Sequence, residues 1–412
     1  MAVAVETQQR TIALNGIDNA TSSVTAAAHT TGSNTNLMAV LHGPNDLRIE
    51  ETITSSPLQD EIQIHVRATG LCGSDLHYYC HGKNGQFALQ HPMCLGHESV
   101  GEIVAFGPTS SAIKNKHQFK LQQRIAIEPG RNCEQCSYCQ TGKYNLCKNM
   151  RFASSAKTAP HLHGTLQRFI NWPIRLCHPL PDHVDMHSAA LAEPLAVVLQ
   201  AFKRSRFVKG QSVLVIGAGA VGLLACAASK HFQACTTSAI DVSQNRLDLA
   251  QSLGWCDSTY LNTNSSQFTD EKELVQHIKS NLKNIDQDGF DVVYECTGVP
   301  TCVRSAIYAA KPGGVVCMIG MGHPTMTLPM DAAALREVDI VGVFRYANMF
   351  PQAIELLSNS PVMASLHNGK PIVQAILSHK FPLSKADQAF ETMKTGKSVD
   401  GKGVIKAMVV DE

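Results

Sequence analysis

The chain of 412 residues lacks several features that mark whole classes of protein. No apolar run approaches the roughly 20 residues that a helix needs to cross a bilayer. The formal net charge is only +1, so no overall field favours nucleic acid or an anionic membrane. The N-terminus has no basic region followed by an apolar core, and Arg10 is the only arginine or lysine before Arg48, so we expect neither a secretory signal nor a mitochondrial presequence. We therefore expect a cytoplasmic protein without nucleic-acid or membrane partners.

Cysteine, in contrast, is abundant. The 14 cysteines of a chain without a secretory signal fit metal ligands and reduced thiols better than disulfides. The length favours two domains over one core. Residues 1–36 are rich in Ala, Thr, Ser and Asn and poor in large apolar groups, so they bury too little surface to offset ordering. We expect a disordered tail there.

One short stretch combines three metal-binding side chains. Cys72 precedes Ser74, and the pair His97-Glu98 follows. A thiolate, an imidazole and a carboxylate supply three ligands to one zinc and leave open the fourth position, which a catalytic zinc requires. The Ser74 hydroxyl, two residues from the thiolate, is close enough to pass on a proton from a bound alcohol. The alternative is a small buried Cys72 and a core His97, but the surrounding glycines and the downstream motifs favour zinc.

The surrounding segments have the pattern of short strands. Residues 61–68 alternate between apolar and polar, as a strand with one buried face does. Residues 99–105 and 123–127 read as further strands, separated by Gly, Pro and Ser clusters. The sequence therefore predicts a β-rich domain that carries the metal-binding stretch on its loops.

Four closely spaced thiols follow, namely Cys133, Cys136, Cys139 and Cys147. Their spacing suits a tetrahedral structural zinc, which would replace a hydrophobic core in a segment with few large apolar residues. Four unrelated free cysteines are the alternative. Further on, Glu193 stands in apolar surroundings, where a carboxylate is costly unless it is paired or near a metal, although it could equally cap a helix.

The middle of the chain indicates a dinucleotide-binding fold. The apolar run 212–216 leads directly into Gly217, Gly219 and Gly222 and then into a helical pattern. Between a strand and a helix, this G-x-G-x-x-G spacing directs backbone N–H groups at a pyrophosphate. Asp241 supplies the acidic residue expected about 20 positions on, which binds ribose hydroxyls and repels a 2′-phosphate. The pattern favours NAD over NADP.

Strand and helix patterns then continue to alternate. Residues 290–298 and 313–322 each read as a strand with a turn that approaches a ligand. Arg246 could cover an adenine, or it could be a solvated helix residue. The last part of the chain, through residue 409, has strand character again, and we expect it to rejoin the first domain.

Several motifs, in the right order from about residue 38 to 410, resemble the zinc-dependent medium-chain alcohol dehydrogenases, closest to the sorbitol, xylitol and L-arabinitol dehydrogenase branch. They are GLCGSDLHYY, LGHESVGEIV, the four-cysteine lobe, AEPLAV, GAGAVGLL, ECTG and REVDIVGVFRYAN. The resemblance implies an α/β fold in which a GroES-like β-rich catalytic domain is interrupted by a Rossmann domain with a doubly wound parallel sheet. The implied limits are a tail at 1–36, the catalytic domain at 37–194, the Rossmann domain at 195–342 and a return to the catalytic domain at 343–412.

The resemblance also implies roles for individual residues. It implies a catalytic zinc on Cys72, His97 and Glu98, with Glu193 beside it or intermittently on it, and a proton relay at Ser74. It implies a structural zinc on the four-cysteine lobe. The polyol pocket would be lined by Tyr78, Phe152, Glu193, Arg345 and Tyr346. The NAD site would include Gly217, Gly219, Val221, Gly222, Asp241, Arg246, Gly320, Met321, Gly322, Phe344 and Arg345. Many relatives are homotetramers, so we expect a homo-oligomer.

These features predict reversible NAD-linked oxidation of a secondary alcohol. The simplest such substrate is a sugar alcohol, which is oxidised at one of its carbons. The first alternative is the same zinc and NAD chemistry on a non-sugar alcohol or ketone of specialised metabolism. The second is a zinc-free enzyme similar to quinone reductases, against which Cys72, His97 and Glu98 argue. The third is a non-enzymatic zinc-binding module built on the four cysteines, although no basic stretch beside them suggests nucleic-acid binding.

The sequence departs from the family pattern at a few positions. Gln233 stands where relatives usually have glycine, and residues 236–238 are polar where their strand is more apolar. Residues 154–163 replace a shorter loop beside the pocket, and Tyr79 replaces a frequent tryptophan. We expect these changes to affect the substrate and not the reaction. His161 and His163 read as solvated loop histidines and not as metal ligands.

Overall fold

The computed structural model describes residues 35–109, 118–263, 267–398, 401 and 403–411. Strand β1 (Thr35–Gly43) begins inside the segment that we expected to be a tail. The amide of Asn36 donates to Oε1 of Gln167 and to the carbonyl of Phe169, which ties this strand to the next layer. Residues 35 and 36 therefore do not belong to the expected tail, and residues 1–34 lie outside the described residues.

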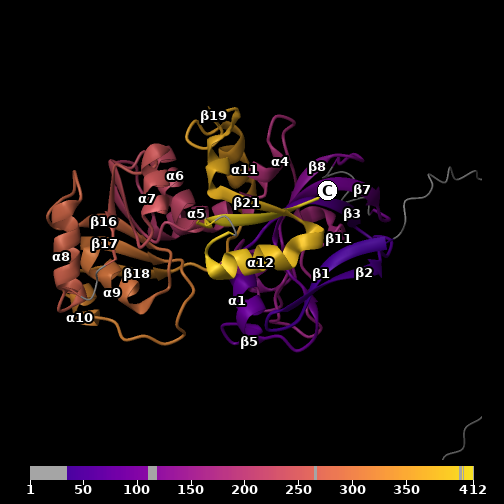
Figure 1. Cartoon of the computed structure of the whole chain (residues 1–412), viewed down its shortest axis with the longest axis horizontal. Coiled ribbons are helices and arrows are strands. Elements are labelled where there is room, and N and C mark those ends of the chain that lie inside the picture. The colour runs from indigo at the N-terminus through magenta and orange to yellow at the C-terminus, as the bar shows by residue number, and fades with distance from the viewer. Residues whose placement is uncertain (1–34, 110–117, 264–266, 399–400, 402, 412) are drawn as a thin grey trace, which may run out of the picture. The chain divides into compact units, whose positions relative to one another are not determined.

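A seven-stranded sheet carries the metal-binding stretch. Its strand order is β12-β8-β7-β3-β22-β21, and β11 also pairs with β3. β11 pairs with the first half of β3 and β22 with the second half. Figure 1 shows the yellow C-terminal strands beside the indigo and purple ones. The strands are β3 (Glu61–Gly70), β7 (Glu98–Phe106), β8 (Arg124–Ile127), β11 (Phe169–Pro173), β12 (Cys177–Pro179), β21 (Leu377–Pro382) and β22 (Lys406–Val410).

A second, six-stranded sheet is parallel throughout. Its order is β15-β14-β13-β16-β17-β18, with the first strand in sequence in the middle, as in a doubly wound fold. Every residue of β13 is buried because helices cover both faces of the sheet. The strands are β13 (Ser212–Ile216), β14 (Thr236–Asp241), β15 (Ser258–Leu261), β16 (Phe290–Glu295), β17 (Ala310–Met318) and β18 (Asp339–Gly342).

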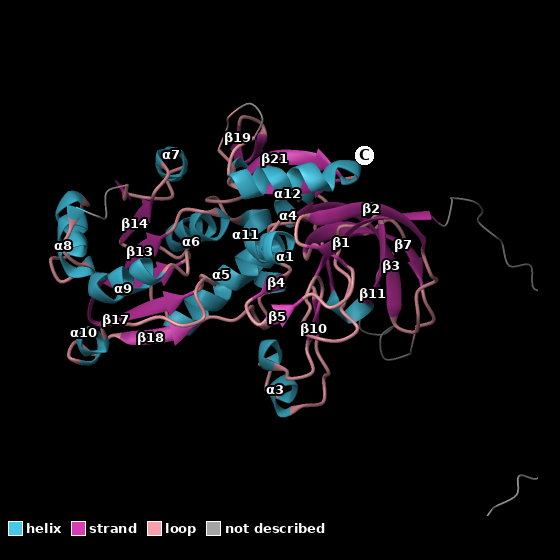
Figure 2. Cartoon of the chain, turned by 60° about the horizontal axis from the view of Figure 1, so that its bottom comes forward, coloured by secondary structure: helices cyan, strands magenta, loops and turns pink. Residues whose placement is uncertain are grey.

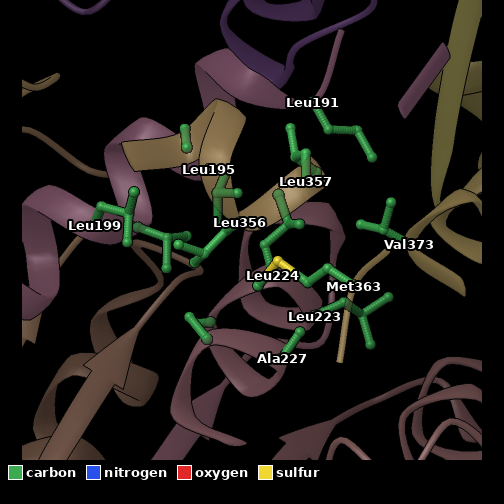
Figure 3. Packing of buried hydrophobic residues seen from close by; sticks show 14 of the residues in the cluster. Leu191, Leu195, Leu199, Leu223, Leu224, Ala227, Leu356, Leu357, Met363 and Val373 are labelled. Atoms are coloured by element: carbon green, nitrogen blue, oxygen red, sulfur yellow. The ribbon is translucent and has the colours of Figure 1, made fainter. Parts of the chain in front are cut away.

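The side chains of β13 alternate between two hydrophobic clusters. Val213 and Val215 join the cluster with α5 (Ala192–Ser205), α6 (Ala220–His231) and α11 (Phe350–Asn359). Leu214 and Ile216 join the cluster with α8 (Glu271–Asn281) and α9 (Pro300–Ala309) on the other face. Figure 3 shows Leu195 and Leu199 of α5 beside Leu224 of α6 and Leu356 of α11. The dinucleotide fingerprint at the end of β13 is thus fixed by two packed layers.

The remaining elements are short. A three-stranded sheet contains β2 (Asp46–Ile53), β1 and β6 (Met93–Cys94), and small pairs join β4 (Lys83–Asn84) to β5 (Phe87–Ala88), β9 (Gly130–Arg131) to β10 (Arg151–Phe152) and β19 (Leu366–His367) to β20 (Lys370–Pro371). The other α-helices are α1 (Gly73–His81), α3 (Ser137–Gln140), α4 (Met186–Ala189), α7 (Gln244–Ser252), α10 (Met330–Ala334) and α12 (Ala386–Thr395). Short 3₁₀ turns are η1 (Tyr144–Leu146), η2 (Ile174–Leu176), η4 (Ile372–Ile376) and η5 (Leu383–Lys385). Figure 2 separates these helices from the strands by colour. Among the described residues no helix is both long and apolar enough to span a bilayer.

Candidate active site

We predicted that the metal-binding stretch lies on loops, but part of it is helical. Cys72 is the N-cap of α1, so Ser74 falls in the first turn of that helix and Tyr78 one turn later. The helix ends at Gly82, whose left-handed φ of 64° and N–H bond to the Tyr78 carbonyl close it. A helix holds Cys72, Ser74 and Tyr78 in a fixed relation, which a flexible loop would not.

The three predicted zinc ligands come together. The ligand atoms of Cys72, His97 and Glu98 all lie within 4.8 Å of one another. His97 and Glu98 are buried at the start of β7, and Cys72 is partly exposed. One thiolate, one imidazole and one carboxylate at this spacing suit the three-ligand geometry of a catalytic zinc with an open position. The residues present therefore fit the metal.

Asp75 orients His97 from behind. Its Oδ2 lies 3.3 Å from Nδ1 of His97, and its Oδ1 accepts bonds from the hydroxyl of Ser154 (2.5 Å) and the N–H of Gly96 (3.3 Å). Burial opposes protonation of His97, but the Asp75 carboxylate outweighs it and raises the pKa of His97. A carboxylate on one ring nitrogen fixes the tautomer that leaves the other free for a metal.

Glu98 has a buried cationic partner. Nζ of Lys406, the first residue of β22, lies 2.6 Å from Oε1 of Glu98 and also contacts Oε2. A Cβ at Gly70 would lie 2.3 Å from Oε2 of Glu98, so glycine leaves room for the carboxylate. This ion pair keeps a buried negative charge compensated at the metal site.

Glu193 faces the same site from the first turn of α5. Burial raises the pKa of its carboxyl to about 7, and the charges of His97 and Glu98 act on it in opposite directions. Its other neighbour is Tyr346, whose pKa is raised by burial and by the Glu193 carboxylate. The alternative of a helix cap does not describe this residue, because the N-cap of α5 is Leu191 and no side chain caps the helix.

Arg345 supplies a cation beside the metal ligands. Its guanidinium carbon lies 3.8 Å from the ring centre of Phe152, and that ring packs against His97 with centroids 5.5 Å apart. Burial lowers the pKa of Arg345 to about 10, so it remains charged at neutral pH. Within the described part of the chain, Nη1 of Arg345 and the Tyr346 hydroxyl have no hydrogen-bond partner. Tyr78 is also buried, and its hydroxyl accepts a bond from the N–H of Ala156 (3.0 Å).

The four predicted structural thiols also come together. Their Sγ atoms lie within 4.8 Å of one another, with Cys133 3.4 Å from Cys147 and Cys136 3.6 Å from Cys139. A tetrahedral zinc with bonds of about 2.3 Å places its sulfurs about 3.8 Å apart, so the lobe fits that metal. Hydrogen bonds from the N–H groups of Gln135 and Cys136 lower the pKa of Cys133 to about 6, which favours the thiolate form.

The glycine fingerprint leaves room for a dinucleotide. Gly217 has φ of 95°, and a Cβ at Gly222 would lie 1.8 Å from the carbonyl oxygen of Gly217. Gly219 caps α6, and no described atom lies within 4 Å of the position its Cβ would occupy. Free backbone donors at a helix N-terminus with open space before them are a cradle for phosphate.

Asp241 ends β14 next to this cradle. Its Oδ2 accepts a bond from the N–H of Ala218 (2.6 Å) and its Oδ1 from that of Ser243 (2.9 Å). Arg246 lies 3.8 Å from Asp241 and donates to the carbonyl of Val404 (3.1 Å). Both contacts are made by the guanidinium, so the half-buried Arg246 is tied to the fold and is not a freely solvated residue.

The turns that follow β16 and β17 form a second wall beside this cradle. A Cβ at Gly320 would lie 2.1 Å from the N atom of Gly298, and one at Gly322 would lie 1.9 Å from its carbonyl oxygen. The two glycine-rich turns after β16 and β17 therefore pack directly on each other. Met321 and Phe344 are exposed there, and Val221 is half-buried on α6.

One prediction about the divergent positions is wrong. His161 is not solvated but buried, and its Nε2 accepts bonds from the N–H groups of Gln90 (2.9 Å) and His91 (3.3 Å). His163 is exposed as predicted, although its Nδ1 accepts a bond from the N–H of Cys94 (3.1 Å). The ring of Tyr79 stacks on Phe390 of α12 (5.1 Å) and its hydroxyl donates to Glu391, so the effect of this position on the substrate stays a prediction.

The structure adds site residues that we did not predict. Asp75 and Ser154 act on His97, and Lys406 acts on Glu98, each through contacts far apart in the sequence. His77, three residues after Ser74 on α1, is an exposed imidazole whose pKa is lowered by partial burial and by His81. The i, i+3 spacing of Ser74 and His77 could have identified this last residue from the sequence.

A three-ligand zinc geometry on a β-rich sheet, next to a dinucleotide cradle, defines a zinc-binding dehydrogenase. Two family models agree: the alcohol dehydrogenase GroES-like domain matches residues 58–182, and the zinc-binding dehydrogenase model matches residues 220–359. Among curated proteins, sorbitol dehydrogenase of Bos taurus is 38% identical over 88% of this chain and 94% of its own length. Sorbitol dehydrogenase of Arabidopsis thaliana is 36% identical over 90% of this chain and 94% of its own length.

Among solved structures, L-idonate 5-dehydrogenase of Escherichia coli superposes with a TM-score of 0.77 at 28% identity, over 91% of this chain and 98% of that one. The chain belongs to the zinc-dependent medium-chain alcohol dehydrogenases, in the branch of the sorbitol, xylitol and L-arabinitol dehydrogenases. It is an oxidoreductase that acts on a small-molecule alcohol with zinc and NAD as its cofactors.

Proposed function

We propose that this enzyme oxidises a secondary alcohol group of a sugar alcohol, such as sorbitol, xylitol or L-arabinitol, reversibly to the ketone. The observation that carries the proposal is Arg345, a half-buried arginine over the Phe152 ring whose buried Nη1 has no partner among the described residues. An unpaired buried donor favours a substrate with several hydroxyl groups, because an apolar alcohol would leave it unsatisfied. Tyr346 presents a second such group.

The roles of the cofactors follow from the residues that would hold them. Zinc on Cys72, His97 and Glu98 supplies Lewis-acid polarisation of the alcohol oxygen. NAD held by the glycine turn and Asp241 would supply the hydride acceptor, and the protein would align it with the alcohol. We assign its pyrophosphate to the Gly217–Gly222 turn and its adenosine ribose to Asp241. The other NAD contacts that we propose are Val221, Arg246, Gly320, Met321, Gly322, Phe344 and Arg345.

The chain's own side chains then handle the proton and the substrate. Ser74 takes up the hydroxyl proton, and His77, one helical turn on, passes it to solvent. Arg345 and Tyr346 bind further hydroxyl groups of the polyol, and Tyr78 and Phe152 line the pocket. Glu193 stays beside the metal and accepts a hydrogen bond from substrate or water.

Three further predictions belong with this proposal. We propose domain limits of 35–194, 195–342 and 343–412, since β1 begins at Thr35 and the seven-stranded sheet takes strands only from the first and last of these ranges. We propose a homo-oligomer, a tetramer by resemblance, and a cytoplasmic location. Light scattering of the purified protein tests the assembly, and fractionation of cells that express the tagged chain tests the location.

Initial rates of NADH formation with sorbitol, xylitol, L-arabinitol and several non-sugar secondary alcohols test the substrate class, with NADP in parallel. We expect one polyol to be turned over far faster than the rest, and only with NAD. Arg345→Met should raise the KM for that polyol, and Arg48→Met, on an exposed arginine, is the matched control. Activity confined to non-sugar alcohols, or an unchanged KM in Arg345→Met, would contradict the proposal.

Cys72→Ser tests the catalytic metal separately. This variant should lose most activity and one of two zinc ions per chain. Its circular dichroism spectrum should stay as in the wild type, and it should keep the zinc on the four thiolates. Full metal content together with wild-type turnover would remove Cys72 from the catalytic site.

A non-sugar alcohol is the second candidate because of the divergent loop 154–163. Ser154 contacts Asp75, the carboxylate behind His97, and the N–H of Ala156 contacts the Tyr78 hydroxyl, so this loop reaches both the support of a metal ligand and the pocket wall. A loop in that position can select a different alcohol without changing the chemistry. The substrate panel separates the two candidates.

A further inference from the structure

We propose that the four-cysteine lobe (residues 133–147) positions Arg345 for substrate binding, through two of its side chains, Asn145 and Tyr144. The inference rests on the proposed role of Arg345 in holding polyol hydroxyls. It assigns to the lobe a task beyond its own stability, namely setting the affinity of the active site for its substrate.

The first contact lies on the N-terminal side of Arg345. The Asn145 amide is buried and donates a hydrogen bond of 2.9 Å to the carbonyl of Phe344, the residue directly before Arg345. Asn145 belongs to the 3₁₀ turn η1 and lies two residues before Cys147, the most buried thiol of the lobe. Any shift of Cys147 is therefore transmitted to Phe344 through one short turn.

The second pair of contacts lies on the C-terminal side. The Tyr144 hydroxyl accepts a bond from the N–H of Asn348 (2.7 Å) and donates to Oε1 of the buried Glu128 (2.6 Å). The Asn348 amide returns a bond to the carbonyl of Gly142 (2.9 Å). The lobe thus holds the segment 344–348 on both sides of Arg345.

The backbone of this segment needs such support. Arg345 and Asn348 have φ angles of 51° and 62°, in the left-handed region that residues with a Cβ rarely adopt. Residues in this conformation persist where the surrounding contacts over-determine them, and they cluster at ligand-binding positions. Here the conformation sets the Arg345 guanidinium 3.8 Å from the centre of the Phe152 ring, with Nη1 unpaired by any described residue.

Asn145 and Tyr144 are therefore positioning residues, which act through Arg345 and do not touch the substrate. Loss of either should weaken polyol binding, while the glycine cradle and Asp241 stay in place because they lie on other elements. Both zinc ions should remain, since neither side chain is a thiol of the lobe.

The experiment measures KM for the polyol, kcat, the NAD dissociation constant and zinc content in Asn145→Ala and Tyr144→Phe. Asn149→Ala is the matched control, an exposed asparagine just outside the lobe. We expect the polyol KM to rise roughly tenfold in both test variants, the effect of one lost hydrogen bond on a charged group's position. The control should keep the wild-type KM and NAD affinity, and zinc content should not change in any of the three.

The same substitutions in an Arg345→Met background decide the mechanism. If Asn145 and Tyr144 act through Arg345, their effect on KM should shrink to less than about twofold there, since coupled residues are non-additive. An equal increase in both backgrounds would overturn the inference and leave the role of Arg345 intact. So would a raised KM in Arg345→Met with a wild-type KM in both lobe variants. A wild-type KM in Arg345→Met alone would instead overturn the proposed function on which the inference rests.

Discussion

The ammonium group of Lys406 lies 2.6 Å from Oε1 of Glu98, and the two side chains are 4% and 1% exposed. Lys406 is thus the only cationic side chain that the described structure places in an ion pair with this carboxylate. Two charges buried this deeply depend on each other, because neither has water to solvate it. The pair is also adjacent to the metal, which is a second source of positive charge for Glu98.

Replacing Lys406 with Met should destabilise the metal-free protein by about 3–5 kcal/mol, because a buried carboxylate is left unpaired. The zinc-loaded protein should lose less, since the metal compensates Glu98. Thermal unfolding with and without a chelator measures both losses. Lys385→Met, on an exposed lysine, controls for the loss of a surface charge. Equal losses in the two forms would show that Lys406 does not act through the metal site.

Asp75→Asn should weaken zinc binding at the catalytic site by about 10–100-fold, as loss of a carboxylate partner of a metal-bound histidine does. Asn has nearly the same size, so the change removes the charge that holds Nδ1 of His97. Competition with a coloured chelator measures the affinity, and the four-thiolate site of the same sample is the internal reference. Asp248→Asn, on the exposed side of α7, should have no effect. Unchanged zinc affinity in Asp75→Asn would mean that Asp75 serves only the packing of α1.

Asp241→Ala should raise the KM for NAD by at least about tenfold, because the carboxylate that would bind the ribose hydroxyls is removed. The same change should reduce the preference for NAD over NADP, because it removes the carboxylate that repels a 2′-phosphate. Steady-state kinetics with both cofactors at saturating polyol give the two ratios. Asp257→Ala, a carboxylate that pairs with Lys230 further from the cradle, is the control. A constant NAD to NADP ratio would remove Asp241 from the cofactor site.

Glu295 should make stability depend on pH. Burial raises the pKa of this carboxyl above its ordinary value of 4.5, although the N–H groups of Thr297 and Gly298 donate to it. The folded state therefore binds the proton more tightly than the unfolded state. The stability that this group contributes is fully present below pH 4.5 and is lost as the pH rises through the pKa of the group in the folded state.

Glu295→Gln should therefore lose less stability than wild type as the pH is raised from about 5 to about 8. Urea unfolding at several pH values measures the difference in free energy of unfolding. Glu355→Gln, on the exposed face of α11, should follow the wild-type curve. A wild-type pH dependence in Glu295→Gln would refute the assignment.

The parallel sheet could be predicted closely from the sequence because its signals are local. The run 212–216 coincides with β13, and Asp241 ends β14 as expected. Gln233, at a position where relatives have glycine, has φ of 60°, so the glycine-like conformation persists without glycine. The polar run before Asp241 is buried, with the hydroxyls of Ser238 and Ser258 bonded to each other across neighbouring strands.

The zinc ligands could be predicted for the same reason, since ligand type and spacing are visible in the chain. Their supporting residues could not, because each is recognised only by a partner that is distant in sequence. Lys406 is 308 residues from Glu98, and Ser154 is 79 residues from Asp75. The sequence alone indicates a solvated loop histidine at His161, because its bonds from the N–H groups of Gln90 and His91 are visible only in the folded chain. Roles at individual site residues remain predictions that the proposed variants test.

The pairing of β22 with β3 has a consequence for how the chain is made. Translation proceeds at about 5–20 residues per second, so Lys406 is synthesised roughly 15–60 s after Glu98, 308 residues earlier. During that interval the edge of β3 that pairs with β22 at Met408–Val410 is open, while the strands of the parallel sheet can already join each other. We therefore expect chains that end before Lys406 to be cut by protease near β3 and the released chain of 412 residues to resist. The buried partner of Glu98 is thus supplied late in synthesis, and until then the open edge of β3 can pair with strands of other chains.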